Sequence, residues 1–368
     1  MDWIRRERLL FFLLLLFPLL WFGTAMPIGD LPFLIHWDTI ATLTGLMVLS
    51  SAIYWSGGAN YAARQLLRRM RSEQQIVIAL CLLAAVLAAV ITNDVALFLV
   101  IPLSLTLARI ARLPLGRLVV FQALAVNAGS ALSPIGNPQN IFLWQTSEVS
   151  FTAYAWGMLP LAVPMLVVLG AGLFLAFSGR PLVLENLPDR SEAVNQALFW
   201  PTLMLYPVFL VALELGYGWP AVLVVLIVYG FWQKSRLKEI DWALLLLFVL
   251  MFLNIGMLTS FSPMQSFAES LLNLPGGEVT AGILLSQIIS NVPAAIFLEP
   301  FSSDWQRLGW GVNLGGFGLA IGSLANLIAL RLAWQPGLVW QFHLWAVPVL
   351  FFSWVLLLAQ QWILGLFA

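Results

Sequence analysis

Two short polar tripeptides interrupt otherwise apolar sequence, and their residue types suit ion binding rather than covalent chemistry. Thr92-Asn93-Asp94 and Ser290-Asn291-Val292 lie 198 positions apart, and each is followed by a largely apolar segment, which reaches Pro102 in the first case and Glu299-Pro300 in the second. An asparagine amide both donates and accepts hydrogen bonds, so it can face an ion or a substrate without adding net charge. The two tripeptides are therefore candidate parts of a binding site for a small ion.

A second pair of segments follows the tripeptides in the same order. Residues 127–140 align without a gap on residues 313–326, and the identical pairs are Asn127/Asn313, Gly129/Gly315, Ile135/Ile321, Gly136/Gly322 and Asn140/Asn326. Proline and glycine break a helix here, and backbone groups freed in an apolar setting cost several kcal/mol unless they find partners. Each segment is therefore predicted to be a broken helix that faces a polar site. The candidate binding residues are Thr92, Asn93, Asp94, Ser133, Gly136, Asn137, Asn140, Ser290, Asn291, Gly322, Ser323 and Asn326.

The elements that position these residues are transmembrane helices. Apolar side chains make up 61% of the 368 residues and charged ones 9%, which excludes a soluble globular domain and requires a lipid solvent. The predicted fold is an all-α polytopic membrane protein with about nine full spans and two re-entrant hairpins. The uninterrupted spans are residues 9–25, 38–56, 151–177, 197–215, 219–232, 241–261 and 337–367, and the two broken helices complete the nine.

The basic residues predict how the chain is oriented. Lys and Arg favour the cytoplasmic side, and all their clusters can lie there only if residues 73–109 enter and leave on one side, as a hairpin does. The N-terminus is then cytoplasmic and the C-terminus periplasmic or extracellular, and we expect a bacterial inner (plasma) membrane. The clusters are Arg5/Arg6/Arg8, Arg64/Arg68/Arg69/Arg71, Arg109/Arg112/Arg117, Arg180/Arg190 and Lys234/Arg236/Lys238.

The repeated order divides the chain into two halves of opposite orientation. The first repeat is predicted at residues 1–180, with a hairpin at about 74–112 and a broken helix at about 116–145. A linker loop and a single connecting span occupy residues 181–217, and this span inverts the half that follows. The second, inverted repeat covers residues 218–368, with a hairpin at about 277–303 and a broken helix at about 305–334.

Paired broken helices in inverted repeats indicate a secondary transporter with its site near the middle of the membrane. Half-helix N-termini suit an anion and unwound carbonyls suit Na⁺. An enzyme would need an activated nucleophile or a metal with several ligands, whereas the chain has two histidines, the single Cys81 and no His-Glu-x-x-His. We expect no catalytic activity and no cofactor beyond a coupling ion, Na⁺ or H⁺. A channel and an intramembrane enzyme are the other classes considered.

The tripeptides and the two six-residue elements, Ile135 to Asn140 and Ile321 to Asn326, resemble those of the ion transporter superfamily. That group includes sodium-coupled dicarboxylate symporters, citrate transporters, sodium/proton antiporters and arsenite/antimonite permeases. Thr-Asn-Asp-Val-Ala at residues 92–96 looks closest to the arsenite permease branch. Gly-Asn-Pro-Gln-Asn at residues 136–140 is similar to the Gly-Thr-Pro-Pro-Asn element of the dicarboxylate branch.

The resemblance implies Na⁺ sites at Asn93 with Gly136 and at Asn291 with Gly322. It also exposes a departure, since the dicarboxylate branch has threonine where this chain has Asp94 and Val292. A carboxylate repels an anion and a valine offers it no donor, which argues against a dicarboxylate and gives Asp94 a role in proton or cation coupling.

The expected function is alternating-access transport of a small inorganic or organic anion coupled to Na⁺ or H⁺. The alternative is proton-coupled efflux of arsenite, antimonite or a cation, with the metalloid passing as a neutral hydroxide. The expected partners are the lipid bilayer and that small solute, without nucleic acid, and the sequence leaves a homodimer open.

Overall fold

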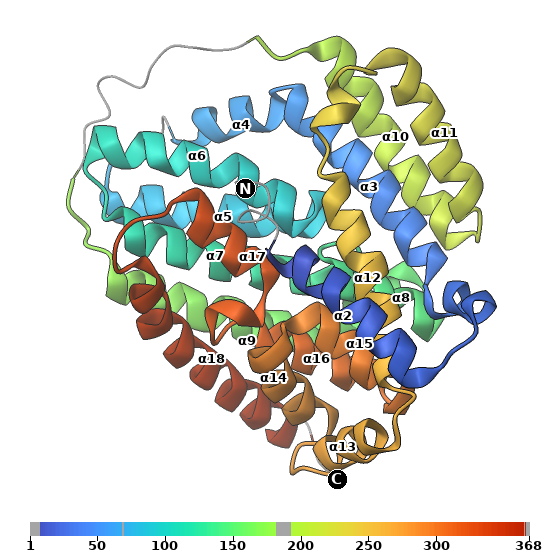
Figure 1. Cartoon of the computed structure of the whole chain (residues 1–368). Helices are drawn as coiled ribbons and strands as arrows, with labels where there is room; N and C mark the ends of the chain where they lie inside the picture. The colour runs from blue at the N-terminus through green and yellow to red at the C-terminus, as the bar shows by residue number, and fades with distance from the viewer. Residues whose placement is uncertain (1–7, 68–69, 182–192, 364, 366–368) are drawn as a thin grey trace.

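The computed structural model describes residues 8–67, 70–181, 193–363 and 365, and within them the chain is helical with no β-strand (Figure 1). The predicted all-α class is confirmed. Arg5, Arg6, Arg68, Arg69 and Arg190 of the basic clusters, and residues 182–192 of the predicted linker, lie outside the described residues. The elements before the centre of the chain are α2 (Arg8–Thr24), η1 (Ile28–Leu34), α3 (Trp37–Trp55), α4 (Gly58–Leu67), α5 (Glu73–Ile91), α6 (Asn93–Ala111), α7 (Leu115–Leu132), α8 (Pro138–Ser147), α9 (Phe151–Ala176) and α10 (Gln196–Glu214).

The remaining elements follow a similar order. They are α11 (Gly218–Trp232), η2 (Arg236–Glu239), α12 (Trp242–Leu258), α13 (Ser262–Leu272), α14 (Glu278–Ile289), α15 (Asn291–Leu298), η3 (Glu299–Phe301), α16 (Trp305–Gly315), η4 (Ala320–Gly322), α17 (Leu324–Leu332) and α18 (Leu338–Ile363). In each half, two apolar helices lead to a short amphipathic helix, a helical hairpin, a pair of half-helices and a 26-residue helix, α9 or α18.

The described helices include six that are long and apolar enough to cross a membrane. These six are α5, α6, α7, α9, α10 and α18, and the number rises to eight if η1 with α3 and α12 with α13 each form one bent span. The nine full spans therefore remain a prediction. Two of them, at residues 9–25 and 219–232, correspond to α2 and α11, which are shorter apolar helices. The arms of the first hairpin, with 19 residues each, are long enough to cross, whereas the 12 residues of α14 extend only about 18 Å.

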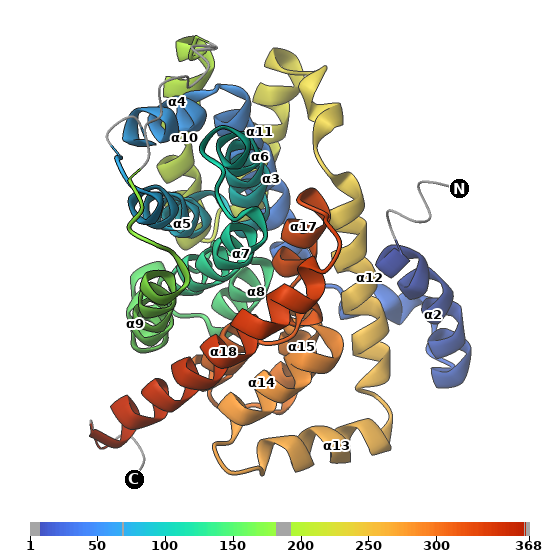
Figure 2. The same cartoon turned by 90° about the vertical axis from the view of Figure 1, so that its left-hand side faces the viewer.

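The packing joins the two halves throughout. Helix α2 packs on α12, and α11 packs on α3, so the opening helices of each half contact the other half. Near the centre, α8 lies beside α15 and α7 lies beside α17 (Figure 2). Within each half the first arm of the hairpin packs on the first half-helix, as α5 on α7 and α14 on α16. The two helix breaks are consequently enclosed by elements from both halves.

Small residues allow the hairpins to approach the half-helices closely. A Cβ added at Gly129 of α7 would overlap the carbonyl oxygen of Ala85 in α5, and one added at Gly315 of α16 would lie 2.5 Å from the Cβ of Ser286 in α14. Without an aqueous hydrophobic effect between them, membrane helices depend on such close backbone contact and on interhelical hydrogen bonds. The glycines therefore fix where each hairpin tip meets its helix break.

We expect Gly129→Ala to destabilise the protein by about 1–3 kcal/mol, because the added methyl pushes α5 away from α7. Thermal unfolding of the detergent-solubilised protein measures this loss. Gly170→Ala on α9 is the matched control, since nothing lies within 4 Å of its new Cβ. A Gly129→Ala protein as stable as the Gly170→Ala control would contradict the close contact.

Candidate functional site

Two helix breaks lie at the centre of the protein. Helix α7 ends at Leu132, and α8 starts at Pro138 with Asn137 as its N-cap, whose Oδ1 accepts the backbone N–H of Asn140 at 2.9 Å. Helix α16 ends at Gly315, and α17 starts after Ser323, whose hydroxyl accepts the N–H of Ala325 at 3.3 Å. Both second half-helices thus begin at a capped N-terminus inside the protein, with its positive end directed at the break.

Four buried asparagines connect the two breaks through reciprocal hydrogen bonds. Asn127 of α7 donates its Nδ2 to Oδ1 of Asn326 in α17 at 2.8 Å. Asn313 of α16 donates its Nδ2 to Oδ1 of Asn140 in α8 at 2.7 Å. In the alignment of the two segments, which are 186 residues apart, Asn127 corresponds to Asn313 and Asn140 to Asn326. Exchanging each residue for its counterpart therefore turns one bond into the other. Each half therefore supplies a donor and an acceptor to the other half in the same way.

The caps of the two half-helices extend the same pattern. The Ser323 hydroxyl donates to Oδ1 of Asn127 at 3.0 Å, and Nδ2 of Asn137 donates to Oδ1 of Asn313 at 3.0 Å. These four residues are all at most 3% exposed. Amides that are buried and satisfied in this way hold the two capped N-termini in fixed positions relative to each other.

The amide nitrogens of Asn140 and Asn326 hold the unwound backbone. Asn140 donates to the carbonyls of Ser130, Ala131 and Ser133 at 3.0–3.2 Å. Asn326 donates to the carbonyl of Gly316, the counterpart of Ser130, at 2.8 Å. These four carbonyls are thereby paired within the protein, as the apolar environment requires.

Both hairpin tips adopt a backbone conformation that favours glycine, although neither is glycine. Thr92 has φ 82° and ψ 149°, and Ser290 has φ 77° and ψ 158°. Such conformations cost about 1–3 kcal/mol each and are concentrated at functional sites. At the first tip the N–H of Asn93 donates to the carbonyl of Gly136 at 2.8 Å, which joins the tip to the break.

The tip side chains retain unused hydrogen-bonding capacity. Oδ1 of Asn93 accepts the N–H of Asp94 at 3.0 Å, and Oδ1 of Asn291 accepts the Ser290 hydroxyl at 3.5 Å. Within the described part of the chain, neither amide nitrogen has an acceptor and the Asp94 carboxylate has no donor. These groups are therefore available to a solute.

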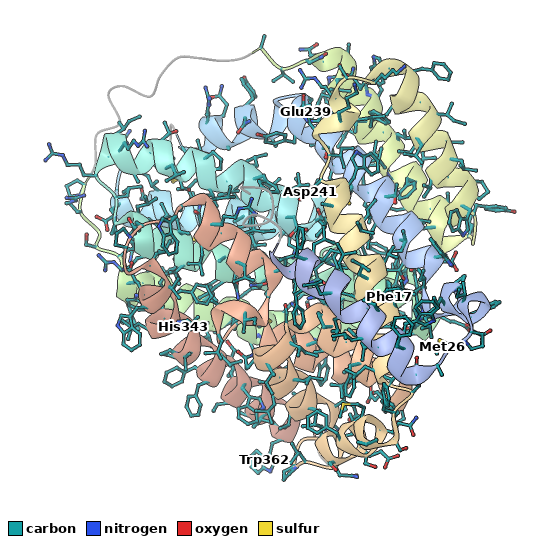
Figure 3. All side chains as sticks on the ribbon, viewed as in Figure 1. Phe17, Met26, Glu239, Asp241, His343 and Trp362 are labelled. Carbon is teal, nitrogen blue, oxygen red and sulfur yellow. The ribbon has the colours of Figure 1, made fainter. Side chains whose placement is uncertain are left out.

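A cavity of about 890 Å³ leads away from the first tip. Thr92 and Asp94 line it, and so do Glu239 of η2 and Asp241, the residue before α12. Figure 3 labels Glu239 and Asp241. Arg331 of α17 also lines the cavity. Among the described residues, three carboxylates and one guanidinium thus line a space large enough for a small solute and several water molecules.

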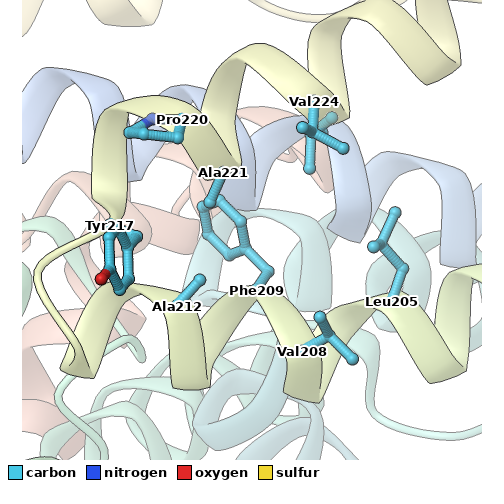
Figure 4. Close-up of a pocket in the computed structure, with 9 residues that line it drawn as sticks. Leu205, Val208, Phe209, Ala212, Tyr217, Pro220, Ala221 and Val224 are labelled. Carbon is cyan, nitrogen blue, oxygen red and sulfur yellow. The ribbon is translucent and has the colours of Figure 1, made fainter.

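Two other cavities have a different character. A cavity of about 340 Å³ between α10 and α11 has apolar walls that include Phe209 and Val224 (Figure 4). A third, of about 480 Å³, is lined by Asp38 and Glu214, which accept the indole N–H of Trp219 at 2.8 Å and the N–H of Phe151 at 2.9 Å. Neither is lined by a residue of the hairpin tips. Among the described residues, no three His, Cys, Asp or Glu side chains could hold a metal ion together.

The structure brings many of the predicted site residues together and adds others. Asn93 meets Gly136, while Asn137, Asn140, Ser323 and Asn326 join the amide network. Thr92 and Asp94 face the cavity, and the Ser133 hydroxyl accepts the N–H of Ile135 at 3.3 Å. No hydrogen bond in the described structure joins Asn291 to Gly322.

Asn127 and Asn313 were not predicted as site residues. Their identity at matching positions of the two segments was the available signal. Sequence identity between the halves marked these positions, but only the packing shows that each amide is bonded to the opposite half.

We expect Asn313→Ala to destabilise the fold by about 1–3 kcal/mol, because the substitution leaves the buried Oδ1 of Asn140 without its donor and removes one of the two acceptors of Nδ2 of Asn137. Chemical or thermal unfolding would show the loss, and Asn273→Ala, at an exposed position after α13, is the control. A double-mutant cycle with Asn140→Ala should give a coupling of about 0.5–3 kcal/mol. Strictly additive effects would mean that the two amides do not interact.

Comparison with known proteins gives consistent results. A family model described as citrate transporter matches residues 2–311. The inner membrane protein YbiR of Escherichia coli is 41% identical over 324 residues, which is 88% of this chain and 87% of that protein. An uncharacterized transporter of Methanocaldococcus jannaschii is 33% identical over 308 residues, 82% of each chain. A putative transporter of Dictyostelium discoideum, arsB, is 26% identical over 133 residues, 36% of this chain and 23% of that protein.

Proposed function

Because the chain belongs to the citrate transporter family (CitMHS), we propose that this membrane transporter is a secondary active carrier of a small anion, coupled to Na⁺ or H⁺. The predicted membership of the ion transporter superfamily is confirmed. The substrate, the coupling ion and the mechanism are the proposal, and they follow from the arrangement of the helix breaks.

The mechanism that we propose is alternating access around a site between two inverted repeats. Its main support is the pair of reciprocal bonds, Asn127 to Asn326 and Asn313 to Asn140, which a two-fold relation between the halves would generate. The matching order of elements and the crossed packing of α2 on α12 and α11 on α3 agree with it. A carrier of this kind places its site where the broken helices meet.

The single observation that carries the proposal is the convergence of groups at the first break. The Asp94 carboxylate lines the cavity, the unused amide belongs to the preceding residue Asn93, and the N–H of Asn93 bonds to Gly136, just before the N-terminus of α8. A helix N-terminus and an amide donor bind an anion, and a carboxylate binds the proton or cation that is transported with it. One site can therefore take both solutes with little net charge buried.

The direction in which the cavity leads is part of the proposal. Glu239 is the last residue of η2, which begins at Arg236, contains Lys238 and lies two residues after Lys234. The positive-inside rule assigns this cluster to the cytoplasm, which makes the cavity cytoplasmic, with the N-terminus on the same side and the C-terminus outside. The conformation would then be an inward-facing one.

The second candidate function is proton-coupled efflux of arsenite, antimonite or a cation. It is favoured by the described residues of the cavity lining, which include the three carboxylates of Asp94, Glu239 and Asp241 and the guanidinium of Arg331. An acidic lining attracts cations and tolerates neutral hydroxides, whereas it repels anions. The partial similarity to the Dictyostelium transporter named arsB agrees with this alternative over a third of the chain.

The substrate class can be tested by ligand stabilisation of the purified protein. Oxyanions, carboxylates and metalloid hydroxides are screened with and without Na⁺, and a solute that binds the folded state raises its midpoint of unfolding. We expect a carboxylate or oxyanion to raise it, followed by uptake of that anion into proteoliposomes under an imposed Na⁺ or pH gradient. Stabilisation by metalloid hydroxides alone would favour the second function.

We expect Asp94→Asn to reduce gradient-driven flux about tenfold or more while the protein still binds its solute. The reason is that the amide cannot take up a proton or offer a negative charge to a cation. Flux into proteoliposomes is compared under imposed pH and Na⁺ gradients, with Glu269→Gln, at an exposed carboxylate of α13, as the control. If the Asp94→Asn protein kept the pH and cation dependence of the wild type, Asp94 would have no part in coupling.

A further inference from the structure

The second helix break contains a side-chain amide that has no counterpart at the first. Gln287 of α14 donates its Nε2 to the carbonyl of Gly315 at 2.7 Å, and its Oε1 accepts the N–H of Leu319 at 2.7 Å. The register that pairs Thr92 with Ser290 places Ala89 at the matching position of α5. A neutral amide therefore occupies the second break, where the corresponding side chain of the first hairpin is a methyl group.

Gln287 is needed because the second break is longer. Helix α16 stops at Gly315, whereas α7 continues to Leu132, the counterpart of Gly318. The extra unwound turn leaves a carbonyl and an N–H without helical partners, and the single amide binds both. Gly318 has φ 55°, and a Cβ there would overlap Oε1 of Gln287, so the loop closes directly on the amide.

This arrangement weakens the second break as a cation site. A cation binds carbonyl oxygens through their lone pairs, and the Nε2 donor occupies one of the two lone pairs of the Gly315 carbonyl. The ideal Cβ position of Gly322 is 3.4 Å from Oε1 and 3.5 Å from Nε2, so the amide also lies beside that glycine. Nε2 of Gln287 donates to the carbonyls of Ile283 and Gly315, so it adds positive partial charge beside the unwound segment.

The two hairpin tips also differ in charge, and this difference again favours a cation in the first half. Asp94 faces the cavity with a carboxylate that has no donor in the described structure, and its counterpart is the buried Val292. The first half thus has a negative group at its tip and no counterpart of Gln287, while the second half has Gln287 and no negative group at its tip. Two independent differences point to the first half as the place where a cation or proton binds.

We propose that cation coupling is confined to the first half, and that Gln287 is a positioning residue that holds the second break in the shape a second cation would otherwise maintain. Confinement to the first half gives one coupling cation per transport cycle, and this consequence rests on the proposed function. Binding of the cation to the purified protein does not depend on transport and can be measured separately.

The test measures the midpoint of thermal unfolding, Tm, of purified protein at about pH 8.5, where free carboxyls are ionised. Na⁺, Li⁺ and K⁺ are compared with choline at constant ionic strength. We expect the Tm of Asp94→Asn to be independent of these cations. In Asp94→Asn/Gln287→Glu, a carboxylate oxygen replaces Nε2 beside the Gly315 carbonyl, and a cation between the two oxygens should raise Tm by about 2–4 °C.

The matched control is Asp94→Asn/Gln265→Glu, since Gln265 of α13 also donates Nε2 to a backbone carbonyl, that of Thr259 at 3.0 Å, away from both breaks. Its Tm should not respond to the cations. The proposal is overturned if Asp94→Asn keeps a cation-dependent Tm that Asn291→Ala removes, or if the Gln287→Glu double variant gains no more than the control.

The wild type provides a measurement that does not depend on folding of the variants. Flux in proteoliposomes against the concentration of the coupling cation or proton should give a Hill coefficient near 1, and a coefficient near 2 would overturn the proposal. Absence of any driven flux would contradict the proposed function, whereas the Tm comparison would still decide whether the second break binds a cation.

Discussion

The structure depends on one constraint, which is that backbone groups released from a helix inside a membrane must find partners within the protein. Four asparagines contribute to this pairing: Asn127, Asn140, Asn313 and Asn326 bond across the halves, and Asn140 and Asn326 also bind carbonyls at the breaks. With the breaks fixed, each hairpin tip can rest beside a capped N-terminus. The position of the cavity beside Asp94 follows from that arrangement.

Much of this architecture is predictable from sequence, because polar residues and prolines are costly in apolar runs and therefore stand out. The breaks after Leu132 and after Gly315 and the tips at Thr92 and Ser290 lie where the pattern of asparagine, glycine and proline places them. The all-α class follows from composition alone. The number of spans is harder to predict. Helix α11, for example, is apolar and packs on α3, but its 15 residues are fewer than a full span needs.

The partners within the site are less predictable because they depend on how the halves face each other. Asn127 bonds to a residue 199 positions away, and nothing local distinguishes this partner from others. Gln287 is a single amide in an apolar helix, and its role depends on an extra unwound turn 28 residues further on. The two halves therefore share a backbone plan while differing in the groups that occupy it, a carboxylate in one and an amide in the other.

The cross-pairing also sets the order of events during biosynthesis. Asn127 emerges from the ribosome 199 residues before Asn326, which at about 5–20 residues per second is an interval of roughly 10–40 s. During that interval the amides and carbonyls of the first break have no native partners from the later half. The newly inserted first half must be shielded by water or by the insertion machinery, and its maturation waits for the last quarter of the chain.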